Sequence, residues 1–242
     1  DSRMYSETVV RDVSGRELSR EVGGLFRQCF PLFSTLFLFN LIESCPKFAM
    51  ESMMGYDAQL YFSALFFPAQ AILLAVGFVY KPQLLRLANI WSNPRRRRRF
   101  DLIMLAVLAV VVVLTLAVIA FMGWIGIGIM SFMYGIDFTK YRMLAFLMVA
   151  AGGLTAAIDF LYQIITVLRH QDLATKPYLI SFGAAIVLSI VLVRIFGLLG
   201  AVLSYLAVMA LLLVLLTLQY VRIRGIISRT TGDPFARRPH YK

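Results

Sequence analysis

The chain has 242 residues, of which 60% are apolar and only 15% are charged, and its formal net charge is +11. Soluble domains average about 45–50% apolar and about 25% charged residues. The apolar excess therefore excludes an ordinary soluble domain and indicates a chain embedded in a membrane. The two cysteines, Cys29 and Cys45, lie at the ends of one apolar stretch and form neither a disulfide framework nor a metal site.

Six stretches are long and apolar enough to cross a membrane, which takes roughly 20 mostly apolar residues in a helix. A polar, partly helical lead over residues 1–24 precedes them, and a basic tail over 225–242 follows. We therefore predict an all-α, polytopic membrane protein whose transmembrane region, 25–224, is one six-helix lobe. The predicted spans cover about residues 25–45, 58–80, 102–122, 141–168, 178–196 and 197–221.

Three of these spans contain residues that interrupt regular helices: Pro31, Pro68 and the pair Gly152-Gly153. Such residues are tolerated in a membrane where neighbouring helices or a polar cavity satisfy the freed backbone groups. Their presence fits a transporter whose helices bend, although kinked helices are common in membrane proteins of many kinds.

Two segments between spans have unusual features. The third span continues as GWIGIGIMSFMYG, residues 123–135, and one helix from Leu102 to its end would extend about 50 Å, beyond a hydrocarbon core of about 30 Å. We expect its glycines, Gly123 first, to break the helix before an interfacial or re-entrant segment. Between the first two spans we expect a short connection, CPKFAMESMMGYD, over residues 45–57.

Five consecutive arginines, Arg95 to Arg99, stand between the second and third spans. Such a run suits a nucleic-acid patch, a nuclear address or the cytosolic anchor of a membrane protein, but no aromatic platform for nucleic acid accompanies it. Six spans place the loops alternately on two sides, and one side carries the arginine run, both termini and most of the 24 Lys and Arg. The positive-inside rule places that side in the cytosol, where the arginines meet anionic membrane lipids. The other side carries Lys47, Lys140, Arg142 and Arg194.

Ionisable residues inside a membrane span are costly and are functional candidates by default. Asp159 lies well inside the fourth span, with Gln163 one helical turn further on the same face, and we expect Asp159 to face a polar cavity rather than lipid. Asn40 and Glu43 share a face of the first span, and Lys47 follows one turn after Glu43. For Glu43 the sequence leaves open a functional role, a head-group position and an ion pair with Lys47.

Two further features limit the chemistry. Lys47 and Arg194 lie near the ends of their spans, so they either line a cavity or extend to the interface as long basic side chains do. Signatures of enzymes are absent, since the sequence has no nucleophile–base pair, HExxH, GxSxG or phosphate loop. The two histidines, His170 and His240, are far apart in sequence. We therefore predict no catalytic residues and no metal site.

Four stretches share their order and spacing with a family of transporters. Residues 46–72 link two helices, and IMSFMYGIDFTKY (129–141) ends an outer segment with Tyr-Gly before the next helix. Residues 167–182 form a short turn, and FGLLGAVLSYLAV (196–208) starts a helix with Gly-x-x-Gly-Ala. Over about residues 22–224, the chain resembles the C-terminal half of polysaccharide flippases of the multidrug/oligosaccharidyl-lipid/polysaccharide (MOP) exporter superfamily.

The resemblance implies a six-helix lobe, one of two that form a V around a central cavity open alternately to each side. Family members move undecaprenyl-diphosphate-linked oligosaccharides from the inner to the outer leaflet of the bacterial cytoplasmic membrane, often coupled to an ion gradient, for cell-surface polysaccharide and lipopolysaccharide biosynthesis. The chain starts with Asp1 rather than Met. We expect it to be the second half of a longer transporter, with the N-terminal lobe as its partner.

On this interpretation the protein binds and gates, makes no covalent bonds and needs no cofactor other than a coupling H⁺ or Na⁺. Cationic side chains in the cavity attract the diphosphate, and a buried carboxylate carries the coupling ion. The candidates for the first role are Lys47, Arg27 and Arg194. The candidates for the second are Asp159 and Glu43, with Asn40 and Gln163 as further polar cavity residues.

Three alternatives remain. A cation-coupled drug or metabolite antiporter of the same superfamily is favoured by aromatic and acidic cavity residues with few cations. A membrane glycosyl polymerase or ligase has a large outer loop with catalytic Arg or His residues, whereas the outer loops here are short. A membrane scaffold without transport needs no acid at the depth of Asp159.

Overall fold

The computed structural model describes residues 15–84, 87, 97–168 and 171–231, without the side chains of 15–29, 31, 56–57, 97–99, 171–172 and 226–231. Within these residues the protein is all-α and contains no strand. The arginine-run side chains and most of the predicted cytosolic lead and tail therefore lie outside the described part. The helices are α1 (Gly15–Met54), α2 (Tyr56–Tyr80), α4 (Arg97–Phe121), α5 (Ile127–Tyr134), α6 (Arg142–Val167), α7 (Gln171–Phe196) and α8 (Leu198–Thr231), with short turns η1 (Lys81–Gln83), η3 (Met122–Gly126) and η4 (Thr139–Tyr141).

Five helical segments of the described chain are long and apolar enough to cross a membrane, so the protein is an all-α, polytopic membrane protein. Helix α1, which contains the predicted first span, is not one of the five, and its described part includes the polar residues Asn40, Glu43 and Lys47. The five segments are Ala58–Gln83, Phe100–Tyr134, Thr139–Val167, Leu173–Phe196 and Leu198–Gly225.

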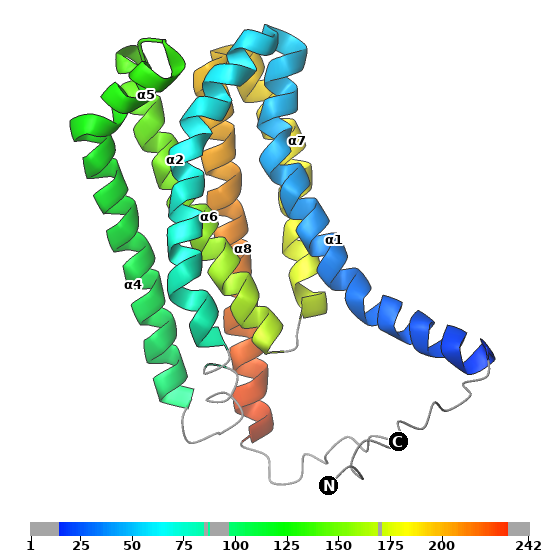
Figure 1. Cartoon of the computed structure of the whole chain (residues 1–242). Helices are drawn as coiled ribbons and strands as arrows, with labels where there is room; N and C mark the ends of the chain where they lie inside the picture. The colour runs from blue at the N-terminus through cyan, green and yellow to red at the C-terminus, as the bar shows by residue number, and fades with distance from the viewer. Residues whose placement is uncertain (1–14, 85–86, 88–96, 169–170, 232–242) are drawn as a thin grey trace, which may run out of the picture.

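The helices pack around α6, which contacts α2, α8 and α4. Helix α7 packs between α8 and α1, and the C-terminal half of α1 returns to α2 and α8 (Figure 1). In the span that contains α6, 67% of an apolar stretch of 18 residues is buried, compared with 11% of such a stretch in the span of α4 and α5. Helix α6 is therefore the core of the bundle, whereas α4 lies at its edge and α1 leaves the bundle toward its N-terminus (Figure 1).

Three glycines reverse the chain at one end of the bundle, which we call the glycine-turn end. Gly55, Gly135 and Gly197 have φ values of 85°, 66° and 58°, a left-handed conformation that glycine adopts without a steric penalty. Gly55 is the whole connection between α1 and α2. The predicted connection over 45–57 is thus wrong for most of its length, because Ala49 and Met50 are buried and packing keeps this segment helical.

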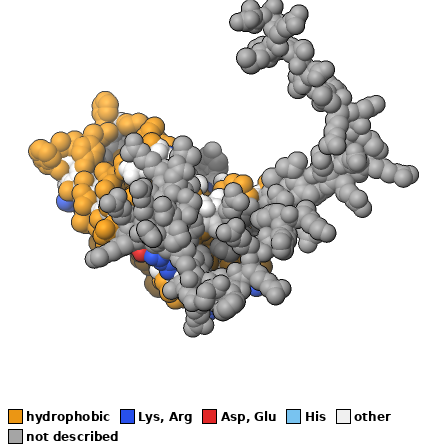
Figure 2. Space-filling model, turned by 90° about the horizontal axis from the view of Figure 1, so that it is seen from below, with side chains coloured by type: hydrophobic (Ala, Val, Ile, Leu, Met, Phe, Trp, Pro, Cys, Tyr) orange, Lys and Arg blue, Asp and Glu red, His pale blue; other side chains and the backbone are white. Residues whose placement is uncertain are grey.

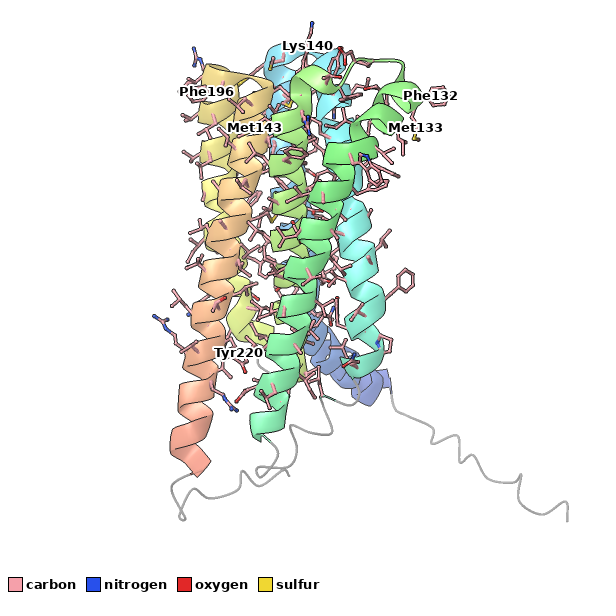
Figure 3. All side chains as sticks on the ribbon, turned by 90° about the vertical axis from the view of Figure 1, so that its left-hand side faces the viewer. Phe132, Met133, Lys140, Met143, Phe196 and Tyr220 are labelled. Carbon is pink, nitrogen blue, oxygen red and sulfur yellow. The ribbon has the colours of Figure 1, made fainter. Side chains whose placement is uncertain are left out.

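The apolar segment after the third predicted span also remains helical. Its glycines produce one turn of π-helix, Met122–Gly126, and α5 follows without a loop. A π-turn frees backbone carbonyls, and the Arg142 guanidinium donates a hydrogen bond to the Gly123 carbonyl at 3.1 Å. Beyond it the side chain of Phe132 is 89% exposed and projects away from the bundle (Figure 3). The expected break is therefore a local irregularity, compensated by a side chain of α6.

The pair Gly152-Gly153 does not interrupt α6, which is continuous from Arg142 to Val167. A Cβ atom on Gly152 would lie 2.7 Å from the Cα of Ala69 in α2, and one on Gly153 would collide with Thr115 of α4. Small residues let membrane helices approach closely. The interpretation of this pair as helix breakers is wrong, because both glycines permit close packing of α6.

We predict that Gly152→Ala lowers the free energy of unfolding by about 1–3 kcal/mol, because overpacking forces α2 and α6 apart. Gly183→Ala is the matched control: a Cβ there meets no atom within 4 Å, and alanine favours a helix over glycine by about 1 kcal/mol. The apparent melting temperature of the protein in detergent micelles measures both changes. Equal melting of the two variants would contradict the packing role of Gly152.

Candidate functional site

The interior of the bundle holds a group of ionisable and hydroxyl side chains that we call the interior polar cluster. Its members come from four helices and pair with one another across the helix interfaces, as a low-dielectric interior requires of polar groups. Thr155 of the cluster lies about 20 Å along α6 from Arg142, near the middle of that helix. The cluster comprises Glu43 and Lys47 of α1, Tyr80 of α2, Thr155 and Asp159 of α6, and Tyr205 of α8.

Glu43 is linked to two other helices through hydroxyl groups. The buried Tyr205 hydroxyl lies 3.2 Å from Glu43 Oε1, to which it donates, and 2.9 Å from Thr155 Oγ1. Thr155 Oγ1 also lies 3.0 Å from the Ala151 carbonyl. Each hydroxyl has one proton to donate, so the Thr155 proton goes either to Ala151 or to Tyr205. The chain of hydroxyls can therefore rearrange without a change in the positions of its oxygens.

Lys47 lies one helical turn after Glu43, with its ammonium 4.4 Å from the centre of the Phe66 ring. Phe66 in turn packs edge-on against Tyr205, with ring centres 5.4 Å apart. The ammonium interacts electrostatically with Glu43, but within the described chain the two groups do not approach to the 4.0 Å of an ion pair. Lys47 is therefore held mainly by a cation–π contact, and it remains close enough to respond to the charge of Glu43.

Asp159 lies one turn after Thr155 on α6 and accepts a hydrogen bond from the Tyr80 hydroxyl of α2. The Tyr80 side chain is fully buried and packs edge-on against Phe160, with ring centres 5.3 Å apart. Asp159 thus faces the bundle interior, and a protein hydroxyl occupies one side of the carboxylate. Tyr205, the partner of Glu43, has a second hydrogen-bond partner, whereas Tyr80 makes no second described hydrogen bond. The bond between Tyr80 and Asp159 therefore links α2 to α6 directly.

The structure does not bring the other predicted site residues into this cluster. The amide of Asn40 is exposed and donates to the Leu36 carbonyl of its own helix at 2.9 Å. Gln163 is half-buried on α6, one turn beyond Asp159. Arg194 is exposed at the glycine-turn end of α7, and the side chain of Arg27 lies outside the described part. Of the predicted residues, the cluster therefore unites Glu43, Lys47 and Asp159.

Sequence reasoning missed the three hydroxyl partners of these residues. Thr155 carries a signal in the sequence, because it lies four residues before Asp159 and hence on the same helix face. Tyr80 and Tyr205 carry none, since they are 79 and 162 residues from their acidic partners. Only the packing of the helices identifies these two tyrosines as members of the cluster.

A separate ion pair lies at the opposite end of the bundle, between Asp101 near the start of α4 and Arg224 of α8. The Tyr220 hydroxyl donates to the same carboxylate at 3.4 Å. The described surface seen from this end is otherwise largely hydrophobic (Figure 2). The pair joins the peripheral α4 to the bundle, and neither residue was predicted as a site.

The bond between Tyr80 and Asp159 yields a stability prediction. We expect Tyr80→Phe to lower the free energy of unfolding by about 1.5–3 kcal/mol, the value of a hydrogen bond to a charged group. Tyr61→Phe is the control, because Tyr61 has only ring contacts among the described interactions. Thermal unfolding of Tyr80→Phe, Asp159→Asn and the double variant measures the coupling. Strictly additive effects would contradict a direct bond between these side chains.

The carboxylates of Glu43 and Asp159 can each take up a proton, and the hydroxyls beside Glu43 can transmit a change in its charge to α6 and α8. Comparison of the chain with models of protein families gives no match, and comparison with curated proteins and solved structures gives no significant match.

Proposed function

We propose that the chain is a six-helix lobe of a MOP-type transporter that moves undecaprenyl-diphosphate-linked oligosaccharide from the inner to the outer leaflet of the bacterial cytoplasmic membrane. The resemblance of its sequence supports this family, and the five long apolar helices together with α1 supply the six spans. Both termini lie in the cytosol in this proposal, as the distribution of Lys and Arg predicts. An N-terminal lobe completes the cavity, and rocking of the two lobes alternates access to it.

The observation that carries the proposal is the hydroxyl relay from Glu43 through Tyr205 to Thr155. When Glu43 is ionised, Tyr205 donates to it and can accept from Thr155. When Glu43 is protonated, the Tyr205 proton can turn to Thr155, whose own proton then goes to the Ala151 carbonyl. The site thus has a complete hydrogen-bond arrangement for each charge state of Glu43, which supports the choice of Glu43 as the coupling residue.

Lys47 supplies the connection to the cargo. The carboxylate of Glu43 offsets the lysine charge while it is ionised. Protonation of Glu43 removes this charge and leaves the ammonium on Phe66, because the other acid one turn from Lys47, Glu51, is exposed. A diphosphate is then the natural counter-ion. Binding of the cargo and protonation of Glu43 favour each other in this scheme, and Arg27 and Arg194 provide further positive charge near the ends of the pathway.

Asp159 has a different role in the proposal. Its carboxylate bonds to the buried Tyr80, with no described relay behind that tyrosine. This arrangement favours Glu43 as the coupling residue, and it favours Asp159 as a fixed joint between α2 and α6.

A second candidate, the cation-coupled drug or metabolite antiporter, is favoured by the composition of the cluster. The cluster contains two acids, Glu43 and Asp159, and Lys47 is its single cation within the described part. The aromatic rings of Phe66, Tyr80, Phe160 and Tyr205 pack against these residues or against one another. A pathway of acids and aromatic rings suits a cationic, apolar molecule. The two candidates differ in what accumulates in cells when the transporter is missing.

The first test is a deletion of the full-length gene followed by extraction of undecaprenyl-linked sugars from each leaflet. We expect a completed repeat unit to accumulate on the cytosolic side, and the wild-type gene to restore it to the outer side. A normal distribution of these lipids, with increased sensitivity to cationic drugs, would reject the flippase and favour the antiporter.

We further predict that Glu43→Gln, introduced into the complementing gene, reduces lipid export to the level of the deletion strain. Glutamine retains the shape and the hydrogen bond from Tyr205, but it does not exchange a proton. Glu51→Gln is the matched control, because Glu51 is exposed on the same helix and its neutralisation should leave export unchanged. Full export by Glu43→Gln, in a membrane fraction that contains normal amounts of the protein, would contradict the coupling role.

A further inference from the structure

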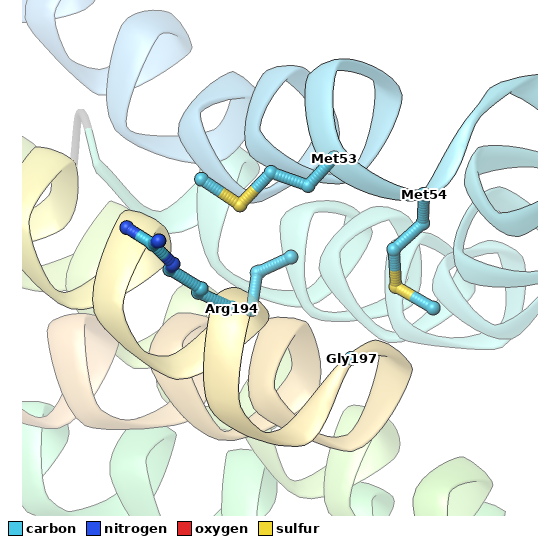
Figure 4. A pocket seen from close by; sticks show the side chains of 5 residues that line it. Met53, Met54, Arg194 and Gly197 are labelled. Carbon is cyan, nitrogen blue, oxygen red and sulfur yellow. The ribbon is translucent and has the colours of Figure 1, made fainter.

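Helices α1 and α7 leave a groove between their halves nearest the glycine-turn end. An inner pocket of about 430 Å³ is lined by both helices and is largely apolar, with Leu41 and Phe48 of α1 opposite Phe182 and Ile186 of α7. An outer pocket of about 450 Å³ follows it along the same two helices, nearer the glycine-turn end. Figure 4 shows it between the two helices, lined by Met53, Met54, Arg194 and Gly197.

The length of the groove matches one leaflet of a membrane. From Phe182 of the inner pocket to Arg194 of the outer pocket, α7 rises about 18 Å. Half of a typical hydrocarbon core is about 15 Å thick. The groove therefore extends from the middle of the membrane to its surface at the glycine-turn end, and its lining is apolar where acyl chains lie.

Arg194 supplies a positive charge at the mouth of this groove. It makes no hydrogen bond or ion pair with any residue that the structure describes. Two other cations at this end of the bundle have partners within the protein, since Lys47 lies on Phe66 and Arg142 bonds to Gly123. Lys140 is exposed there and lies outside the groove. The guanidinium of Arg194 is thus available to an anion, and a membrane surface offers phosphate.

A second polar group lies deeper in the groove. The Ser189 side chain lines the inner pocket and is only 2% exposed, and its hydroxyl has no hydrogen-bond partner within the described chain. Buried hydroxyls without a partner are rare and destabilising. Ser189 stands five positions before Arg194, so its Cα lies about 7.5 Å further along the helix toward the middle of the membrane.

We infer that this groove binds one anionic diacyl phospholipid, which in the predicted orientation belongs to the outer leaflet. The phosphate contacts Arg194, and an acyl chain lies along the inner pocket. An ester carbonyl accepts the hydrogen bond of Ser189 after the buried hydroxyl turns into that pocket. The glycerol backbone places the ester carbonyls a few bond lengths below the phosphate, in the order that Arg194 and Ser189 follow. A prenyl phosphate has no carbonyl for Ser189, and a zwitterionic head group brings a second cation beside Arg194.

Native mass spectrometry of the purified full-length protein, loaded with defined lipids, tests this site. We expect dioleoyl phosphatidylglycerol to be retained over dioleoyl phosphatidylcholine, and Arg194→Gln to reduce that preference about fivefold, as the loss of about one basic contact implies. Lys140→Gln is the control, because Lys140 is an exposed cation at the same end of the bundle (Figure 3) outside the groove. Equal retention of the two lipids, or equal effects of the two substitutions, would overturn the assignment.

The ether-linked analogue of phosphatidylglycerol, which lacks the ester carbonyls, tests the role of Ser189. The wild-type protein should bind the analogue about fivefold more weakly than the ester, the value of one hydrogen bond. Ser189→Ala should bind both lipids alike. A wild-type protein that does not distinguish ester from ether, or a prenyl phosphate that displaces phosphatidylglycerol, would show that the occupant is not a diacyl phospholipid.

Discussion

The structure depends on one constraint: inside a membrane, polar groups must find their partners within the protein. Water cannot solvate a carboxylate or a free carbonyl there, so each such group fixes the position of another helix. Glu43 accepts a hydrogen bond from Tyr205 of α8, and Asp159 accepts one from Tyr80 of α2. The Gly123 carbonyl, freed by the π-turn, is satisfied by Arg142. The polar side chains of this apolar chain therefore determine much of the arrangement of its helices.

Close packing of α6 is the second part of the same arrangement. Hydrophobic burial gives little preference between helices in lipid, so association rests on van der Waals contact and interhelical hydrogen bonds. Gly152 brings α6 against Ala69 of α2, and the Tyr80–Asp159 bond joins the same two helices about two turns further on. Contact between backbones and contact between side chains thus support each other at one interface.

The sequence alone predicts the helical, membrane-embedded character of the chain, because long apolar runs have few other solutions. It also identifies Glu43 and Asp159, since an acid in such a run is unusual. It does not identify the tyrosines that hold them, which depend on the packing of distant helices. The predictions for segment 45–57 and for the pair Gly152-Gly153 are wrong for a related reason, because Pro and Gly suggest a break in a helix. In segment 45–57 the burial of Met50 keeps the chain helical. At Gly152 the glycine permits the close approach of Ala69.

The two acids differ in the freedom of their partners, and under the proposed function this difference bears on transport. Tyr205 can donate to Glu43 or to Thr155, so the charge of Glu43 selects between two hydrogen-bond arrangements that include α1, α6 and α8. Tyr80 has Asp159 as its described hydrogen-bond partner and joins α2 to α6. A carrier needs both properties: one joint that holds while the helices move, and one whose bonding changes with the bound ion. Thr155 and Asp159 lie one helical turn apart on the same face of α6, so the two contacts meet side by side on the central helix.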